Sequence, residues 1–139
     1  MISDYGHHPT EIGSTFIALQ QKYPDKELLA IFQPHQVRRI LEFWEQFVSV
    51  LSSWPHALIY DIYAARENLE NLKEQFSCET TAHVSTVDEL GVIFAATCNK
   101  DYSTQFSDVQ DILTKAQADQ LVIIFSAGEL DYQVRKFLG

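Results

Sequence analysis

The chain has 139 residues, the length of one ordinary domain. Hydrophobic residues make up 46% of it and charged residues 21%, which is typical of a folded globular protein rather than a disordered one. The formal net charge of −9 argues against a nucleic-acid groove and an anionic membrane surface, because both are bound through clustered Lys and Arg. Cys78 and Cys98 are too few for a disulfide scaffold and lack metal-ligand spacing, so we expect a reducing, cytosolic setting.

Apolar runs of strand length alternate with segments of helical periodicity along the whole chain. The expected strands are the tail at 2–3 and the runs at 28–32, 57–62, 81–84, 101–103 and 121–125. The expected helices cover 9–23, 35–52, 67–76, 86–98, 109–116 and 126–137. This alternation predicts an α/β fold, a Rossmann-like and mostly parallel sheet of about five to six strands with helices on both faces. No internal repeat or linker divides the chain, so we expect a single domain over residues 1–139.

Two details of the helices are also predicted. The stripe of apolar residues over 37–51 is the most regular in the chain and indicates one long helix. The sequences Thr86–Glu89 and Ser126–Glu129 have the spacing of capping boxes, which would start the helices that follow them.

Four loops follow apolar strands and should meet at one edge of the sheet, where open α/β sheets bind ligands: 4–8, 32–35, 61–67 and 126–129. The second loop leads into His35, Arg38 and Arg39, which share one helix face because they lie at i, i+3 and i+4. A helix start offers free N–H groups, and an Arg fork binds carboxylates. The pattern therefore predicts a carboxylate site there.

The first of these loops carries the strongest motif. Asp4 to Glu11 resembles the DYGHHPTE motif that opens the C-terminal domain of the Mur ligases, and the similarity is closest to the members that add L-alanine. Phe32 to His35 is similar to the FQPHR segment of those members, Asp61 to Glu67 to their D-[VI]-Y-x-A-x-E segment, and Ser126 to Glu129 to their GAGD segment. The four segments occur in the family's order and span nearly the whole chain.

The resemblance implies an ATP-dependent ligase that joins L-alanine to UDP-N-acetylmuramate in peptidoglycan synthesis. It places Asp4 and Tyr5 at the nucleotide, and His7 and His8 near the reacting centre. The residues implied at the amino-acid substrate are His35, Gln36, Arg38, Arg39, Ser126, Gly128 and Glu129. ATP and Mg²⁺ would be held mainly by a central domain, since this sequence has no G-x-x-x-x-G-K-[ST] motif. We therefore expect a domain of a longer ligase that is inactive alone.

The sequence departs from the family pattern in ways that concern the substrate contacts. Gln36 stands where the family has arginine, and Ser126 and Glu129 replace glycine and aspartate. Two other functions remain open: a ligase that attaches a tripeptide in wall recycling, and a stand-alone, non-catalytic α/β binding module. No metal site is expected, because adjacent histidines such as His7 and His8 point in different directions.

Structural alternatives exist for individual residues. Asp4 could serve only to cap a turn. Arg38 could pair with Glu42 on the helix surface.

Overall fold

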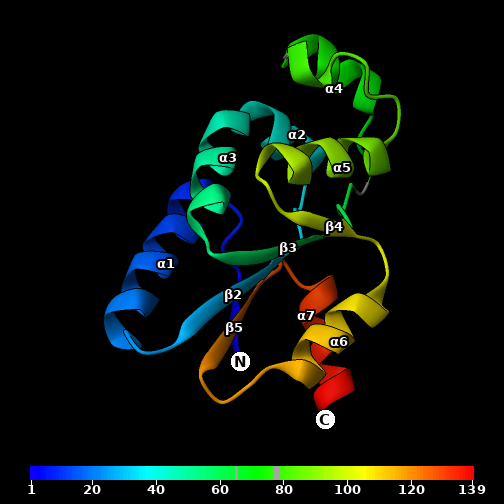
Figure 1. Ribbon diagram of the computed structural model, residues 1–139. Helices are drawn as coiled ribbons and strands as arrows, with labels where there is room; N and C mark the ends of the chain where they lie inside the picture. Colours follow the sequence, from blue (N-terminus) through cyan, green and yellow to red (C-terminus); the bar gives the residue numbers. More distant parts are fainter. Residues whose placement is uncertain (65, 77–78) are drawn as a thin grey trace.

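The computed structural model describes residues 1–64, 66–76 and 79–139. A five-stranded sheet forms its centre, in the order β1-β5-β2-β3-β4, and all of its strand pairs are parallel (Figure 1). The strands are β1 (Ile2–Asp4), β2 (Glu27–Phe32), β3 (His56–Tyr60), β4 (Asp101–Ser103) and β5 (Gln120–Phe125). The predicted α/β class and parallel sheet are confirmed.

Helices cover both faces of the sheet, as predicted (Figure 1). One face packs against α1 (Pro9–Lys22), α2 (Val37–Glu42), α3 (Trp44–Ser53) and α5 (Val87–Thr97). The other face packs against α6 (Phe106–Lys115) and α7 (Glu129–Leu138). The short helix α4 (Leu69–Gln75) lies outside these layers, next to α2, and is followed by a 3₁₀ turn, η1 (Glu79–Thr81). In the described part of the chain, every helix lacks the length or the apolar character needed to cross a membrane.

The strand β2 shows why apolar runs predicted the sheet correctly. Ala30 and Phe32 belong to one core cluster, while Ile31 between them belongs to the cluster on the opposite face. Successive side chains of a strand point to opposite faces, so a strand covered on both sides must be apolar at nearly every position.

The long helix predicted over 35–52 is wrong in one respect, because it is broken at Phe43 into α2 and α3. Phe43 has φ −113° and ψ 32°, and its N–H still donates to the carbonyl of Arg39. The apolar stripe continues across the break through buried Leu41, Trp44 and Phe47, so periodicity alone could not reveal it.

Two further expectations need correction. Residues 81–84 form no strand, since Thr81 ends η1 and the N–H of Val84 donates back to the Thr81 carbonyl in a tight turn. The capping box at Ser126–Glu129 is absent, because the N-cap of α7 is Gly128, which has no side chain to form a cap.

The cap at Thr86 is real, since its hydroxyl accepts from the Glu89 N–H. The Glu89 carboxylate, however, accepts from the N–H and hydroxyl of Ser85. Of the two cysteines, Cys98 is buried, and Cys78 lies outside the described residues.

The sheet order creates the position where a ligand site is expected. Strand β5 lies between β1 and β2; the chain leaves β5 toward α7 on one face and leaves β2 toward α2 on the other. Loops that diverge in this way leave a crevice at the carboxyl edge of the sheet.

Candidate functional site

The crevice at the carboxyl edge holds a pocket of about 370 Å³, here called the switch-point pocket. Its lining comes from the loops after β2, β3 and β5: Gln33, His35, Tyr63, Ala127, Gly128 and Glu129. The rings of His35 and Tyr63 stack with centroids 5.4 Å apart. Gly128 has φ +142° and open space where a side chain would begin, so the backbone itself forms part of the wall.

Gln33 joins the three loops around this pocket, and it is only 4% exposed. Its Oε1 atom accepts from the N–H of Leu130 at 3.2 Å and from the hydroxyl of Ser126 at 3.3 Å. Its Nε2 atom donates to the Asp61 carbonyl at 3.0 Å. Gln33 therefore supplies the cap of α7 that the sequence assigned to Ser126. Gln33 lies within the segment Phe32 to His35, but its role could not be predicted from the sequence because its partners lie far away along the chain.

The motif after β1 is folded by its own polar groups. The Asp4 carboxylate accepts from the Gly6 N–H at 2.6 Å and from the Thr15 hydroxyl at 2.9 Å. Asp4 therefore does cap the turn that follows β1, which is the structural role considered for it. Tyr5 is 64% exposed and free to meet a ligand or a neighbouring domain.

The Nδ1 atoms of His7 and His8 play opposite hydrogen-bonding roles. His7 Nδ1 lies 2.8 Å from the Tyr5 carbonyl oxygen, which can only accept, so Nδ1 carries the proton and Nε2 of a neutral ring is left as an acceptor. His8 Nδ1 lies 3.1 Å from the Thr10 N–H, which can only donate, so here Nδ1 is the acceptor. His8 is the N-cap of α1 and packs edge-on against Phe43 with ring centroids 4.6 Å apart.

A second depression, of about 490 Å³, lies beside the first and is here called the histidine–arginine hollow. It is lined by His7, His8, Glu11, Gln36, Arg38, Arg39, Glu42 and Phe43. The His7 and His35 rings, with centroids 6.3 Å apart, connect the two depressions.

The two arginines of this hollow differ in their availability. The Arg38 guanidinium is 3.6 Å from the Glu42 carboxylate and lies over the Phe76 ring, so the structural alternative for Arg38 is present. The Arg39 side chain has no hydrogen bond or ion pair within the described ranges 1–64, 66–76 and 79–139. Arg39 is therefore the cation in the hollow that is ready for an anionic ligand.

Two of the backbone donors expected to be free at the helix start are occupied by a side chain of the protein itself. The Glu67 carboxylate accepts from the N–H of Val37 at 2.7 Å and from the N–H of Arg38 at 3.0 Å. These are the free donors that the sequence offered to a substrate, and Glu67 already satisfies them. An incoming carboxylate must instead meet the side chains of the hollow.

Acidic side chains near the switch-point pocket, which Glu129 lines, influence one another's ionisation. Burial raises the pKa of the Asp61 carboxyl, and the negative charges of Asp88 and Glu129 raise it further. Burial, followed by the charges of Asp61 and Glu129, also raises the pKa of Tyr60. Carboxylates thus lie near the pocket, while the hollow holds two arginines together with the carboxylates of Glu11 and Glu42.

The structure brings most of the sequence-predicted residues to one edge but into two depressions. His35, Gly128 and Glu129 line the pocket; His7, His8, Gln36, Arg38 and Arg39 line the hollow. Ser126 is buried beneath them, where its hydroxyl accepts from the Gly128 N–H. The described residues contain no group of three His, Cys, Asp or Glu side chains that could hold a metal ion.

Sequence comparison finds relatives that match almost the whole chain. It is 31% identical over 136 residues to the UDP-N-acetylmuramate–L-alanine ligase of Christiangramia forsetii, covering 98% of this chain and 27% of that protein. It is 36% identical over 135 residues to the Aquifex aeolicus ligase of the same name, covering 97% and 26%. No protein-family model matches the chain. The chain thus spans about a quarter of the length of these relatives.

Solved structures share the fold. A UDP-N-acetylmuramate–alanine ligase from Thermotoga maritima superposes with a TM-score of 0.60 at 16% identity, over 97% of this chain and 25% of that one. A domain of a putative tripeptide ligase from Haemophilus ducreyi, described as UDP-N-acetylmuramate:L-alanyl-γ-D-glutamyl-meso-diaminopimelate ligase, superposes with a TM-score of 0.57 at 18% identity. That match covers 98% and 85% of the two chains.

The sheet and its switch-point loops have the fold of a Mur ligase domain. Within that family, the chain is a homologue of the UDP-N-acetylmuramate–L-alanine ligases and corresponds to their C-terminal domain.

Proposed function

We propose that this chain is the C-terminal domain of an ATP-dependent ligase that joins L-alanine to UDP-N-acetylmuramate in the cytoplasm. The observation that carries the proposal is the histidine–arginine hollow, where the available Arg39 faces two histidines at the carboxyl edge of a fold shared with these ligases. The domain would close over substrates held by the other domains, with no role for nucleic acid or membrane.

Arg39 would bind the α-carboxylate of L-alanine through charge-assisted hydrogen bonds, with His35 and Gln36 beside it. Two arginines followed the motif in the sequence, but Arg38 is engaged with Glu42, so Arg39 carries this role. Glu129 and Gly128, across His35, would lie toward the amino group. A zwitterion fits this arrangement, because its carboxylate can meet Arg39 and its ammonium group can meet Glu129.

His7 and His8 would lie near the reacting atoms. The alanine nitrogen attacks the carbonyl carbon of an acyl phosphate made from the sugar carboxylate and ATP, phosphate leaves, and the nitrogen loses a proton. His7 Nε2 is the available acceptor in a neutral ring, because Nδ1 donates to the Tyr5 carbonyl. His8 would instead present an N–H from Nε2, since its Nδ1 caps α1.

Asp4 and Tyr5 would contact ATP at the first loop. The Asp4 carboxylate keeps lone pairs beyond those used by Gly6 and Thr15, so it can still accept from a ribose hydroxyl. The triphosphate and Mg²⁺ need a phosphate-binding loop, which this sequence lacks, and they would therefore be held by the central domain.

The runner-up is a ligase that attaches a tripeptide to UDP-N-acetylmuramate, since the Haemophilus ducreyi domain named for that substrate has the same fold. Relatives of 31% and 36% identity named for L-alanine favour alanine. A stand-alone binding module remains the non-catalytic alternative.

The test is a fusion enzyme in which residues 1–139 replace the matched region of the Aquifex aeolicus relative. The fusion should release phosphate from ATP only when both UDP-N-acetylmuramate and L-alanine are present, and the 139-residue chain alone should release none. Release with the tripeptide but not with L-alanine would favour the runner-up. A folded fusion that binds neither amino substrate would favour the binding module.

A further inference from the structure

The loop between β3 and α4 is joined at several points to the loop after β2 and to the start of α2. The Asp61 carbonyl accepts from Gln33 Nε2 at 3.0 Å, and the Tyr63 N–H donates to the Pro34 carbonyl at 2.9 Å. The next contact is the stacked pair of Tyr63 and His35. Contacts at such regular intervals fix one loop against the other.

The last of these contacts is made by Glu67, and it is the one that involves a charged side chain. Its two carboxylate oxygens accept separately from the N–H groups of Val37 and Arg38, in the first turn of α2. A carboxylate bound to two backbone N–H groups at a helix start is held by the hydrogen bonds and by the helix dipole. Because α2 spans only Val37–Glu42, this cap fixes the direction of the whole helix.

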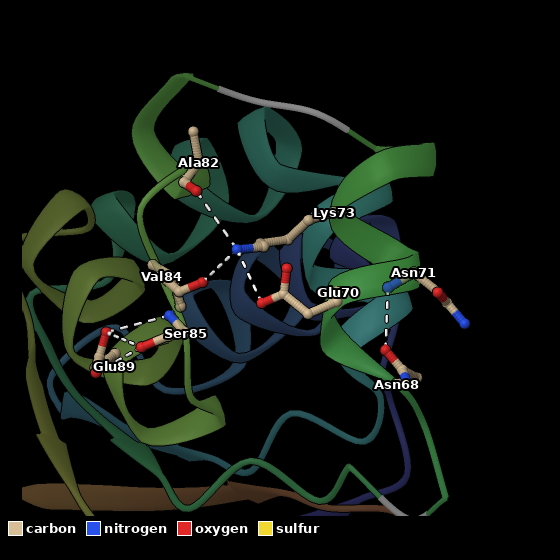
Figure 2. A network of polar contacts seen from close by, with 8 residues as sticks. All are labelled: Asn68, Glu70, Asn71, Lys73, Ala82, Val84, Ser85 and Glu89. Carbon is tan, nitrogen blue, oxygen red and sulfur yellow. Dashed lines mark hydrogen bonds and ion pairs between the residues drawn. The ribbon is translucent and has the colours of Figure 1, made fainter.

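The backbone that carries Glu67 is itself anchored. Asn68 follows it as the N-cap of α4, with its side chain accepting from the Asn71 N–H at 3.1 Å. On the same helix, Lys73 donates to the Val84 carbonyl at 2.6 Å and pairs with Glu70, and its side chain is 16% exposed (Figure 2). The helix α4 is thereby tied to the segment before α5, so Glu67 has a fixed support.

We propose that Glu67 is a positioning residue for the amino-acid site. Its carboxylate sets the start of α2 and thereby places Arg39, in the same first turn, in the lining of the hollow that it shares with His7 and His8. Glu67 touches no substrate in this role. The inference rests on the proposed function, because it assigns Arg39 to the substrate carboxylate.

The matched variants are Glu67→Gln and Glu74→Gln. Glu67→Gln removes the charge and one of the two acceptors while keeping the side-chain shape. Glu74 is an exposed carboxylate on α4 without a polar partner in the portion of the chain that is described, so its change controls for net charge.

The first measurement is amide hydrogen exchange on the 139-residue chain. In Glu67→Gln, the Val37 and Arg38 amides should exchange on the order of tenfold faster or more, because a charge-assisted hydrogen bond is lost, and amides of the central strands should not change. In Glu74→Gln, all of these amides should match the parent chain. Unchanged exchange at Val37 and Arg38 in Glu67→Gln would overturn the cap.

The second measurement is steady-state kinetics of the fusion enzyme. Glu67→Gln should raise KM for L-alanine on the order of tenfold, leave KM for ATP within about twofold and change kcat little, because ground-state placement of the amino acid is what it disturbs. A general loss of structure would move all three constants. Unchanged L-alanine kinetics in Glu67→Gln would refute the positioning role while the function stands, whereas a parent fusion without activity toward either amino substrate would refute the function itself.

Discussion

Replacing Gln33 with leucine tests whether one buried amide holds the pocket together. The change keeps a side chain of similar size but leaves the Leu130 N–H, the Ser126 hydroxyl and the Asp61 carbonyl without their Gln33 partner. Each such hydrogen bond contributes about 1 kcal/mol, and a buried group left unpaired costs about 1–3 kcal/mol. The added apolar side chain offsets part of this loss through burial, by about 1 kcal/mol. We expect the free energy of unfolding to fall by about 2–4 kcal/mol.

Urea unfolding of the 139-residue chain, followed by circular dichroism, measures this change. The midpoint should fall while the slope stays constant, since the same surface is exposed on unfolding. Gln46→Leu is the matched control, because Gln46 is exposed on α3, and its effect should stay within about 0.5 kcal/mol. A loss below about 0.5 kcal/mol for Gln33→Leu would refute the role given to this amide.

Gln33→Glu adds a pH test of the same bonds. A carboxyl at this position, only 4% exposed in the parent chain, should have a raised pKa because its charged form is desolvated. Its protonated form can also donate to the Asp61 carbonyl. The folded state then binds more protons than the unfolded state, so the stability of the variant relative to the parent should fall as pH rises above about 4. A difference between variant and parent that does not depend on pH would contradict this placement.

Three further changes test other parts of the molecule. Gly91→Ala in α5 should destabilise the chain by about 1–3 kcal/mol in urea unfolding despite better helix propensity, because the new Cβ would collide with the Tyr102 ring. A more stable variant would contradict the packing. Burial would raise the pKa of Asp131, but hydrogen bonds from Ser3 and Arg135 outweigh it and lower the pKa. The stability that Asp131 contributes is therefore present above pH ~4 and lost as pH falls below it. The difference in the free energy of unfolding between the parent and Asp131→Asn should shrink on acidification in urea unfolding. A difference that stays constant would refute this. In the fusion enzyme, Arg39→Ala should lower kcat/KM for L-alanine roughly tenfold to hundredfold and change KM for ATP much less; unaltered alanine kinetics would leave Arg39 as a solvated helix charge.

The sheet could be predicted from the sequence because the apolar runs that specify its strands are local signals. The runs around Ala30, Leu58 and Ile123 are apolar at nearly every position, which only a strand covered on both faces requires. The same holds for the start of α1, where Pro9 follows a capping residue. These signals need no knowledge of the rest of the chain.

The contacts that shape the site could not be predicted because they join distant positions. Glu67 caps a helix that begins 30 residues earlier, and Gln33 caps one that begins almost 100 residues later. Capping signals in a sequence lie next to their helix, so Ser126 was the expected cap of α7, and the start of α2 was expected to be open for substrate. The predicted loops do meet at the carboxyl edge of the sheet, but Glu67 already occupies two of the backbone donors there.

The three residues of β1 have a consequence for how the chain folds. Within the described residues they pair with β5 alone, in a register that joins Ile2 to Ile123 and Asp4 to Phe125. Contacts between positions about 120 residues apart form slowly, because a long loop must close before they gain any energy. During synthesis the segment that carries the histidines therefore waits, unpaired, until the last strand has left the ribosome. A ribosome that stalls before residue 120 would leave a chain whose other strands can pair but whose first loop has no strand beside it.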